Sequence, residues 1–96
     1  MSAYVLVNVR SFDDSDGMKR YSATFPATLE AYGGRFVIRG GDIEAREGGW
    51  DGTWLVVIEF PSMSQARQWY ESPEYRRAAA LREGHADLDL VIVDGL

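Results

Sequence analysis

An arginine and a glutamate on neighbouring predicted strands are the residues best suited to bind and act on an anionic molecule. Arg39 lies in the predicted strand 34–40, and Glu59 lies in the predicted strand 54–60. Because side chains alternate between the two faces of a strand, both should project from one face, where opposite charges on adjacent strands pair. Arg39 would hold a carboxylate, and Glu59 would act as acid or base. The alternative is an ion pair that only fixes the register of a dimer.

Polar residues around this pair are candidate ligand contacts. Asn8 interrupts an otherwise apolar predicted strand, and a buried amide needs hydrogen-bond partners. It would bond to Arg39 or Glu59, or it would orient a ligand. Tyr4 and Arg35 are expected on the same face of the sheet, so they join the candidate ligand-binding residues.

Three further side chains are candidate site residues, and each could instead have a purely structural role. His85 is the only histidine, and histidine is the commonest general base. Its place at the end of a predicted helix is more typical of a charge that complements the helix dipole. Trp54 is expected to cover the mouth of a barrel or the seam of a dimer. Tyr75 belongs to an aromatic helix stripe, which is usually core, although it could instead line the rim of a pocket.

The sequence lacks the motifs that hold metals and nucleotides. There is no cysteine, which excludes disulfides, thiolate metal sites and a cysteine nucleophile. The aspartates at 13–16 do not have the spacing of a calcium loop, and the glycine-rich segments do not have that of a phosphate loop. We therefore expect no metal and no cofactor, so any catalysis would be cofactor-free.

The composition predicts one small globular domain. A chain of 96 residues suffices for a single core, and a net charge of −5 makes nucleic acid an unfavourable partner. No apolar run approaches the length of a transmembrane helix, and the N-terminus lacks the pattern of a signal peptide. We expect a cytoplasmic protein that contacts neither nucleic acid nor membrane.

The apolar periodicity predicts an alternating series of strands and helices. Strands are predicted at 4–10, 34–40, 54–60 and 88–94, and helices at 17–32 and 62–71, with a short helical extension from Ser72. An Asp or Ser of the turn 11–17 is expected to cap the first helix, which Pro26 should kink or split and Gly33 should end. Ser62 is expected to cap the second helix, and residues 41–53 to form a hairpin loop. This order predicts a ferredoxin-like α+β domain, in which a four-stranded antiparallel sheet carries helices on one face.

The uncovered face of that sheet carries a mixture of apolar and charged side chains. The residues expected beneath the helices are Phe36, Ile38, Val56, Ile58 and Phe60. The residues expected on the open face are Tyr4, Leu6, Asn8, Arg10, Arg35, Val37, Arg39, Leu55, Val57 and Glu59. Since exposed apolar patches of this size are uncommon on monomers, we predict a homodimer whose sheets face each other across a polar-lined cavity. The alternative is a monomer with one solvated sheet face.

Several short blocks spread over nearly the whole chain match a known pattern. They are Tyr32-Gly33-Gly34-Arg35, Arg39-Gly40-Gly41, Glu47-Gly48, Glu59-Phe60-Pro61-Ser62, Trp69-Tyr70-Glu71-Ser72-Pro73-Glu74-Tyr75 and Arg82. In order and spacing they resemble the "domain of unknown function 1330" family. The resemblance implies a dimeric α/β barrel, whose wider relatives include small monooxygenases, muconolactone-type isomerases and haem enzymes. It implies no particular reaction, because the family has no settled activity.

One position departs from the pattern of that family. The third strand of the family often begins with a basic residue, and here Trp54 stands in its place. If the basic residue contacts a ligand anion, that contact is changed or lost in this chain.

Two functions remain open. The first is a binding site for a small anionic molecule in a pocket on the barrel face, with cofactor-free catalysis by Arg39, Glu59 and His85. The second is a non-catalytic dimeric module in which Arg39 and Glu59 form a structural ion pair. A small molecule that co-purifies with the dimer would distinguish the first from the second.

Overall fold

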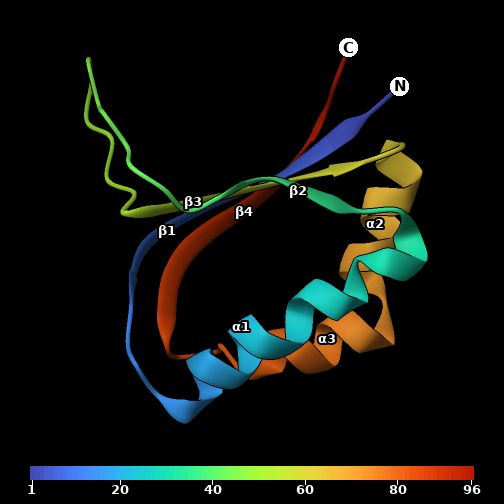
Figure 1. The fold of residues 1–96 in the computed structure, drawn as a ribbon, viewed down its shortest axis with the longest axis horizontal. Coiled ribbons are helices and arrows are strands. Elements are labelled where there is room, and N and C mark those ends of the chain that lie inside the picture. Colours follow the sequence, from blue (N-terminus) through green and yellow to red (C-terminus); the bar gives the residue numbers. More distant parts are fainter.

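The fold is a curved four-stranded sheet with helices packed on one face (Figure 1). A computed structural model describes residues 1–96. The strands are β1 (Ala3–Phe12), β2 (Arg35–Arg39), β3 (Trp54–Phe60) and β4 (Ala86–Asp94). The helices are α1 (Asp16–Thr28), α2 (Met63–Glu71) and α3 (Pro73–Ala80), with a short 3-10 helix, η1 (Glu30–Tyr32), after α1. The antiparallel order β2-β3-β1-β4 confirms the predicted ferredoxin-like α+β fold.

The core lies between the sheet and the helices. Alternation in β1 and β3 places one apolar row of each strand beneath the helices, and the paired residues Val5 and Ile58 are both 0% exposed. Trp69 of α2 and Tyr75 of α3, equally buried, cover this row from the other side. Burying a large apolar side chain contributes roughly 1.5–3 kcal/mol, so this layer is the main source of stability.

A bulge in β2 exchanges the faces of its last residues. Phe36 faces the helices, but the next residue paired with β3 is Ile38, which lies opposite Val57. Val37 is therefore an extra residue, and the alternation that follows it shifts by one position. The prediction for the end of this strand was wrong: Ile38 is 40% exposed on the open face, and Arg39 faces the helices.

The first helix follows its predicted caps but is not split by its proline. The Ser15 hydroxyl caps α1 by accepting a hydrogen bond from the Met18 amide at 3.3 Å. Pro26 lies in the last turn, where few backbone hydrogen bonds remain to be lost, and the helix continues to Thr28 before tightening into η1. Gly33 ends η1 with a φ of 76°, as predicted. Neither α1 nor the shorter helices have the length and hydrophobicity needed to cross a membrane.

Two serines define the starts of α2 and α3. The Ser62 hydroxyl accepts a hydrogen bond from the Gln65 amide at 3.2 Å, which confirms the predicted cap. The buried Ser72 hydroxyl accepts from the Tyr75 amide at 3.2 Å and donates to the Trp69 carbonyl at 2.7 Å. Ser72 therefore ends one helix and begins the next, and its hydroxyl links α2 to α3.

The connection between β2 and β3 is an exposed arm. Residues 41–51 are all exposed, and Figure 1 shows the arm extending beyond the sheet on the side away from the helices. Its base is held to β1, because the Thr53 amide donates to the Val9 carbonyl at 2.7 Å. The predicted hairpin loop is thus present, and only its base contacts the body of the domain.

Candidate functional site

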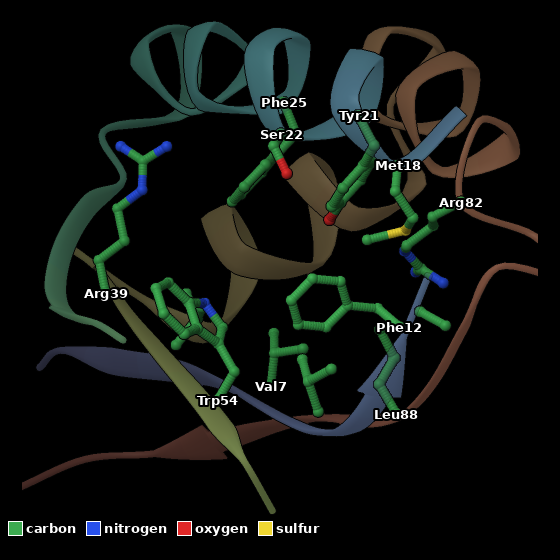
Figure 2. Close-up of a pocket in the computed structure, with 13 residues that line it drawn as sticks. Val7, Phe12, Met18, Tyr21, Ser22, Phe25, Arg39, Trp54, Arg82 and Leu88 are labelled. Atoms are coloured by element: carbon green, nitrogen blue, oxygen red, sulfur yellow. The ribbon is translucent and has the colours of Figure 1, made fainter. Parts of the chain in front are cut away.

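A pocket of about 220 Å³ lies between α1 and the helix-facing side of the sheet (Figure 2). Ten of its thirteen lining residues are hydrophobic. The lining consists of Val7, Val9, Phe12, Met18, Tyr21, Ser22, Phe25, Arg39, Trp54, Val56, Arg82, Ala86 and Leu88. Its charged groups are two guanidiniums, with no carboxylate among them. Such a surface suits an apolar molecule that carries a negative group.

The apolar walls come from one helix and three strands, β1, β3 and β4. Met18, Tyr21 and Phe25 lie at helical spacing on α1, and Figure 2 shows their side chains extending from the helix toward the sheet. The rings of Tyr21 and Phe25 stack with their centroids 4.9 Å apart. Val7 of β1 and Val56 of β3, both 8% exposed, line the opposite wall. Because the walls belong to regular elements, the shape of the pocket is largely set before any ligand binds.

Arg82 is the polar group at one end of the pocket. It follows α3, and its Nη2 donates to the Tyr75 hydroxyl at 3.3 Å, which in turn lies 2.9 Å from the Tyr21 hydroxyl. The Nε of Arg82 is buried and has no hydrogen-bond partner in the protein. Buried donors without partners are uncommon in folded proteins. This N–H has almost no accessible surface, so a ligand oxygen would reach it only after a shift of the Arg82 side chain.

Electrostatics keep this end of the pocket positively charged and able to donate hydrogen bonds. Burial, together with the neighbouring Tyr75, raises the pKa of Tyr21 far above its usual value, so its hydroxyl stays protonated at neutral pH. Burial alone lowers the pKa of Arg82, but the hydroxyls of Tyr75 and Tyr21 outweigh it, and the pKa lies above the usual value. If Arg82 donates to Tyr75 and Tyr75 donates to Tyr21, the proton of Tyr21 is left for a ligand oxygen.

Arg39 and Trp54 form the rim of the pocket on the side of β2. The guanidinium carbon of Arg39 lies 4.4 Å from the centre of the Phe36 ring, and no carboxylate pairs with it. Trp54 is 42% exposed and packs against the backbone of Gly40. Two residues predicted for a site from the sequence thus meet at this pocket.

Glu59 lies on the open face of the sheet, away from Arg39. It forms an ion pair with Arg35 and accepts a hydrogen bond from the Tyr4 hydroxyl at 3.3 Å. The Ser2 hydroxyl, Arg35 and Tyr4 hold the pKa of Glu59 below its usual value, so it is ionised at neutral pH. The predicted pair of Arg39 with Glu59 was wrong, because the bulge in β2 turns Arg39 to the other face and leaves Arg35 beside Glu59.

Asn8 is also on the open face, and it bonds to neither Arg39 nor Glu59. Its Nδ2 donates to Asp51 Oδ1 at 3.2 Å. The backbone of Gly52 lies directly against the Asn8 side chain, whose Oδ1 is buried without a partner. Asn8 therefore holds the base of the arm to the sheet, and its predicted role in ligand binding is not linked to the pocket.

His85 and Tyr75 are placed beside the pocket but do not line it. His85 Nδ1 lies 2.9 Å from Asp13 Oδ2, and the Asp13 amide donates to the His85 carbonyl at 3.0 Å. This pair joins the turn after β1 to the start of β4, and a catalytic role for His85 stays a prediction. Tyr75 is 0% exposed, and its hydroxyl lies 2.9 Å from the Tyr21 hydroxyl. It is therefore a core residue that contacts Tyr21, and it does not form the rim of the pocket.

Sequence reasoning missed Tyr21 and Arg82 as site residues. Tyr21 lies on the apolar side of α1, and Arg82 lies in the turn that continues the apolar side of α3, so both positions suggest core and not a binding site. The available signal was that Arg82 follows Tyr75 by seven residues, which places a charge in line with the buried stripe of α3. A charged residue that continues an apolar stripe needs a partner, and here that partner is a pair of tyrosine hydroxyls.

Solved structures with the same fold have low sequence identity to this chain. A protein of unknown function from Rhodopseudomonas palustris matches with a TM-score of 0.75 and 20% identity, over 99% of this chain and 82% of that chain. A dimeric ferredoxin-like protein of unknown function from Jannaschia sp. matches with a TM-score of 0.66 and 13% identity, over 99% and 100%. The cofactor-independent oxygenase SnoaB from Streptomyces nogalater matches with a TM-score of 0.58 and 11% identity, over 98% and 92%. At these identities the likeness shows the fold alone.

The family assignment comes from the sequence itself. No curated protein matches the chain. The family described as "Domain of unknown function (DUF1330)" matches residues 2–96, which confirms the resemblance carried by the glycine pairs and the Trp69–Tyr75 block. With a match over nearly its whole length, the chain belongs to the DUF1330 family.

Proposed function

We propose that this protein is a homodimer that binds a small, largely apolar molecule with a negatively charged oxygen in the pocket between α1 and the sheet. The observation that carries the proposal is a mostly hydrophobic lining whose charged groups are the guanidiniums of Arg82 and Arg39, with no carboxylate among them. A ligand carboxylate or enolate oxygen would accept hydrogen bonds from Arg82 and from the Tyr21 hydroxyl. The apolar body of the ligand would lie against Phe25 and Trp54.

The energetics favour a ligand that has both an apolar body and a negatively charged oxygen. Apolar surface removed from water contributes about 25 cal/mol per Å², and a hydrogen bond to a charged group contributes about 1.5–3 kcal/mol. The guanidinium of Arg82 is already partly desolvated in the free protein, so less hydration is lost when an anion arrives. A neutral apolar molecule would leave the Nε of Arg82 unpaired and should bind more weakly.

Isothermal titration calorimetry with 2-naphthoate tests the binding function, because this probe joins an aromatic body to one carboxylate. We expect the wild type to bind it and Arg82→Gln to bind it at least ~10-fold more weakly, since one charge-assisted hydrogen bond is lost. Arg67→Gln is the matched control, because Arg67 is exposed on α2 and is not part of the lining. Equal affinity in the wild type and Arg82→Gln, or no binding at all, would contradict the proposal and favour a module without a ligand.

The open face of the sheet supports the homodimer. Its exposed apolar side chains include Ile38 at 40%, Val93 at 45% and Val91 at 48%. Contiguous apolar surface of this kind is commonly covered by another protein surface. Two of the similar folds belong to proteins described as dimeric, which also favours a second copy of this chain as the partner. Sedimentation velocity of the purified chain would distinguish a dimer from a monomer.

Cofactor-free catalysis on the bound molecule is a second candidate function. The favouring observation is the protonated Tyr21 hydroxyl, backed by Tyr75 and Arg82, which could stabilise the oxygen of an enolate. The lining offers no carboxylate or imidazole, so a substrate proton would pass to solvent. Deuterium exchange beside the carbonyl of 2-tetralone in D₂O, followed by NMR, should be faster with the wild type than with Tyr21→Phe. Equal rates would leave binding as the function.

A further inference from the structure

The two arginines of the pocket lie at its opposite ends. Arg39 belongs to β2 and Arg82 to the turn that leads into β4, and Figure 2 shows them on opposite sides of the apolar lining. β2 and β4 are the edge strands of the sheet, with β3 and β1 between them. Neighbouring strands lie about 4.8 Å apart, so the two edges are separated by about 14 Å. The pocket therefore runs across the sheet with a cation near each end.

Neither of these arginines has a carboxylate partner. On the open face, Arg10 pairs with two aspartates of β4 at 2.8 and 2.9 Å, and Arg35 pairs with Glu59. Arg39 contacts the ring of Phe36 instead, and Arg82 contacts a tyrosine hydroxyl. Because the lining of the pocket contains no carboxylate, an anion bound there would be the charge partner of both guanidiniums.

We propose that the ligand of this pocket is an elongated, largely apolar molecule with an anionic group at each end, such as an aromatic dicarboxylate. This inference rests on the proposed binding function and adds to it a second anionic group and a minimum length. Arg82 and Tyr21 hold the inner group, and Arg39 holds the outer group at the rim. The stacked rings of Tyr21 and Phe25 and the indole of Trp54 enclose the middle of the ligand.

Arg39 is suited to receive the outer group. Its side chain is exposed, and its only contact of note is the cation–π contact with Phe36. An exposed cation–π contact is weaker than a charge-assisted hydrogen bond, so a carboxylate at the rim would draw the guanidinium away from the ring. The bulge in β2 is what turns this side chain toward the pocket, since regular alternation would place it on the open face.

Matched pairs of probes test the proposal by calorimetry on the wild-type protein. The pairs, in order of increasing length, are benzoate with terephthalate, 2-naphthoate with naphthalene-2,6-dicarboxylate, and biphenyl-4-carboxylate with biphenyl-4,4′-dicarboxylate. Within each pair only the second carboxylate differs, so a difference in affinity reports on the outer group alone. We expect the diacid whose length fits the span to bind at least ~10-fold more tightly than its monoacid.

Two variants identify which arginine provides the difference. Arg39→Gln should weaken the diacid by at least ~10-fold and the monoacid by much less, so that the advantage of the diacid is lost. Arg67→Gln, which removes an equal charge from an exposed position on α2, should retain the advantage. Because Arg39 makes no ion pair and is exposed, Arg39→Gln should fold normally, and circular dichroism would verify this.

The outcomes separate this inference from the proposed function. Binding of monoacids without any advantage for a diacid would overturn the inference and leave the proposed function standing. A diacid advantage that persists in Arg39→Gln would also overturn it, because the outer group would then contact another residue. Failure of every probe to bind would contradict the proposed function, and the inference with it.

Discussion

Gly40 lies against the Trp54 ring at the rim of the pocket, where a side chain would collide with that ring. Its φ is 74°, and a Cβ at this position would lie 2.6 Å from Trp54 Cζ3 and closer still to two other ring atoms. We expect Gly40→Ala to lower the free energy of unfolding by about 1–3 kcal/mol, because it combines a left-handed backbone with overpacking. Urea denaturation followed by tryptophan fluorescence would measure the loss. Gly48→Ala is the matched control, since Gly48 shares a positive φ of 81° but has no atom within 4 Å of the added carbon.

Asp13 gives the chain a defined sensitivity to acid. Hydrogen bonds from Ser15 and the contact with His85 lower the pKa of Asp13 from 3.8 to about 2. A carboxyl whose pKa is lowered by folding stabilises the protein above its unfolded pKa, and this contribution disappears as the pH falls toward 2. Asp13→Asn should therefore have a lower urea midpoint than the wild type at pH near 7, and the gap should close between about pH 4 and pH 2.

Asp14→Asn provides the comparison for that experiment. Asp14 is exposed in the same turn and takes part in none of the hydrogen bonds that hold Asp13. Its urea midpoint should follow that of the wild type at every pH. A gap for Asp13→Asn that stays constant down to pH 2 would show that the aspartate acts through its shape and not its charge.

At the scale of elements, most of the architecture follows from the sequence, and the part that does not is a single inserted residue. The strand β3 begins and ends where predicted, and the caps at Ser62 and Gly33 are present. Alternation could not reveal this bulge, because Phe36, Val37 and Ile38 are all apolar and are compatible with either face. The extra residue Val37 moved Arg39 to the helix-facing side, and the predicted pairing of charges was lost with it.

The candidate site was harder to predict than the elements that build it. Helical periodicity correctly places Tyr21 and Phe25 on the inner side of α1, but it cannot distinguish a filled core from a pocket of about 220 Å³. That difference depends on how α1 packs over β1 and β3, which involves residues far apart in the sequence. Arg82 belongs to the pocket for the same reason, since its tyrosine partners come from α1 and α3.

The junction of α2 and α3 gives a prediction at the scale of elements. Ser72 is 4% exposed, and its hydroxyl both caps α3 and bonds to the last turn of α2. Ser72→Ala should lower the free energy of unfolding by about 1–2 kcal/mol, because it removes a helix cap and leaves the buried Tyr75 amide without a partner. Ser64→Ala, at an exposed position of α2, should change it little. Equal urea midpoints for the two variants would mean that backbone geometry alone holds this junction.

At the scale of the whole molecule, the two faces of the sheet carry different charge arrangements. The charges of the open face are largely matched, with Arg10 bound to Asp87 and Asp89 and Arg35 bound to Glu59. The helix-facing side keeps its two guanidiniums unmatched. Paired charges among exposed valines suit a stable contact with a second copy of the chain. Unpaired cations in an apolar pocket suit an anionic ligand that binds reversibly.

Val91 tests the assembly of the whole molecule. It is 48% exposed on the open face of β4, opposite Leu6 in the register, so a lysine there is tolerated in a monomer but buried in a face-to-face dimer. We expect Val91→Lys to sediment as a monomer with an unchanged circular dichroism spectrum, because an unpaired charge in an interface opposes association. Ala80→Lys adds the same charge to an exposed position of α3 and should leave the dimer intact. If Val91→Lys still forms the wild-type dimer, the two copies meet through a surface other than the open sheet.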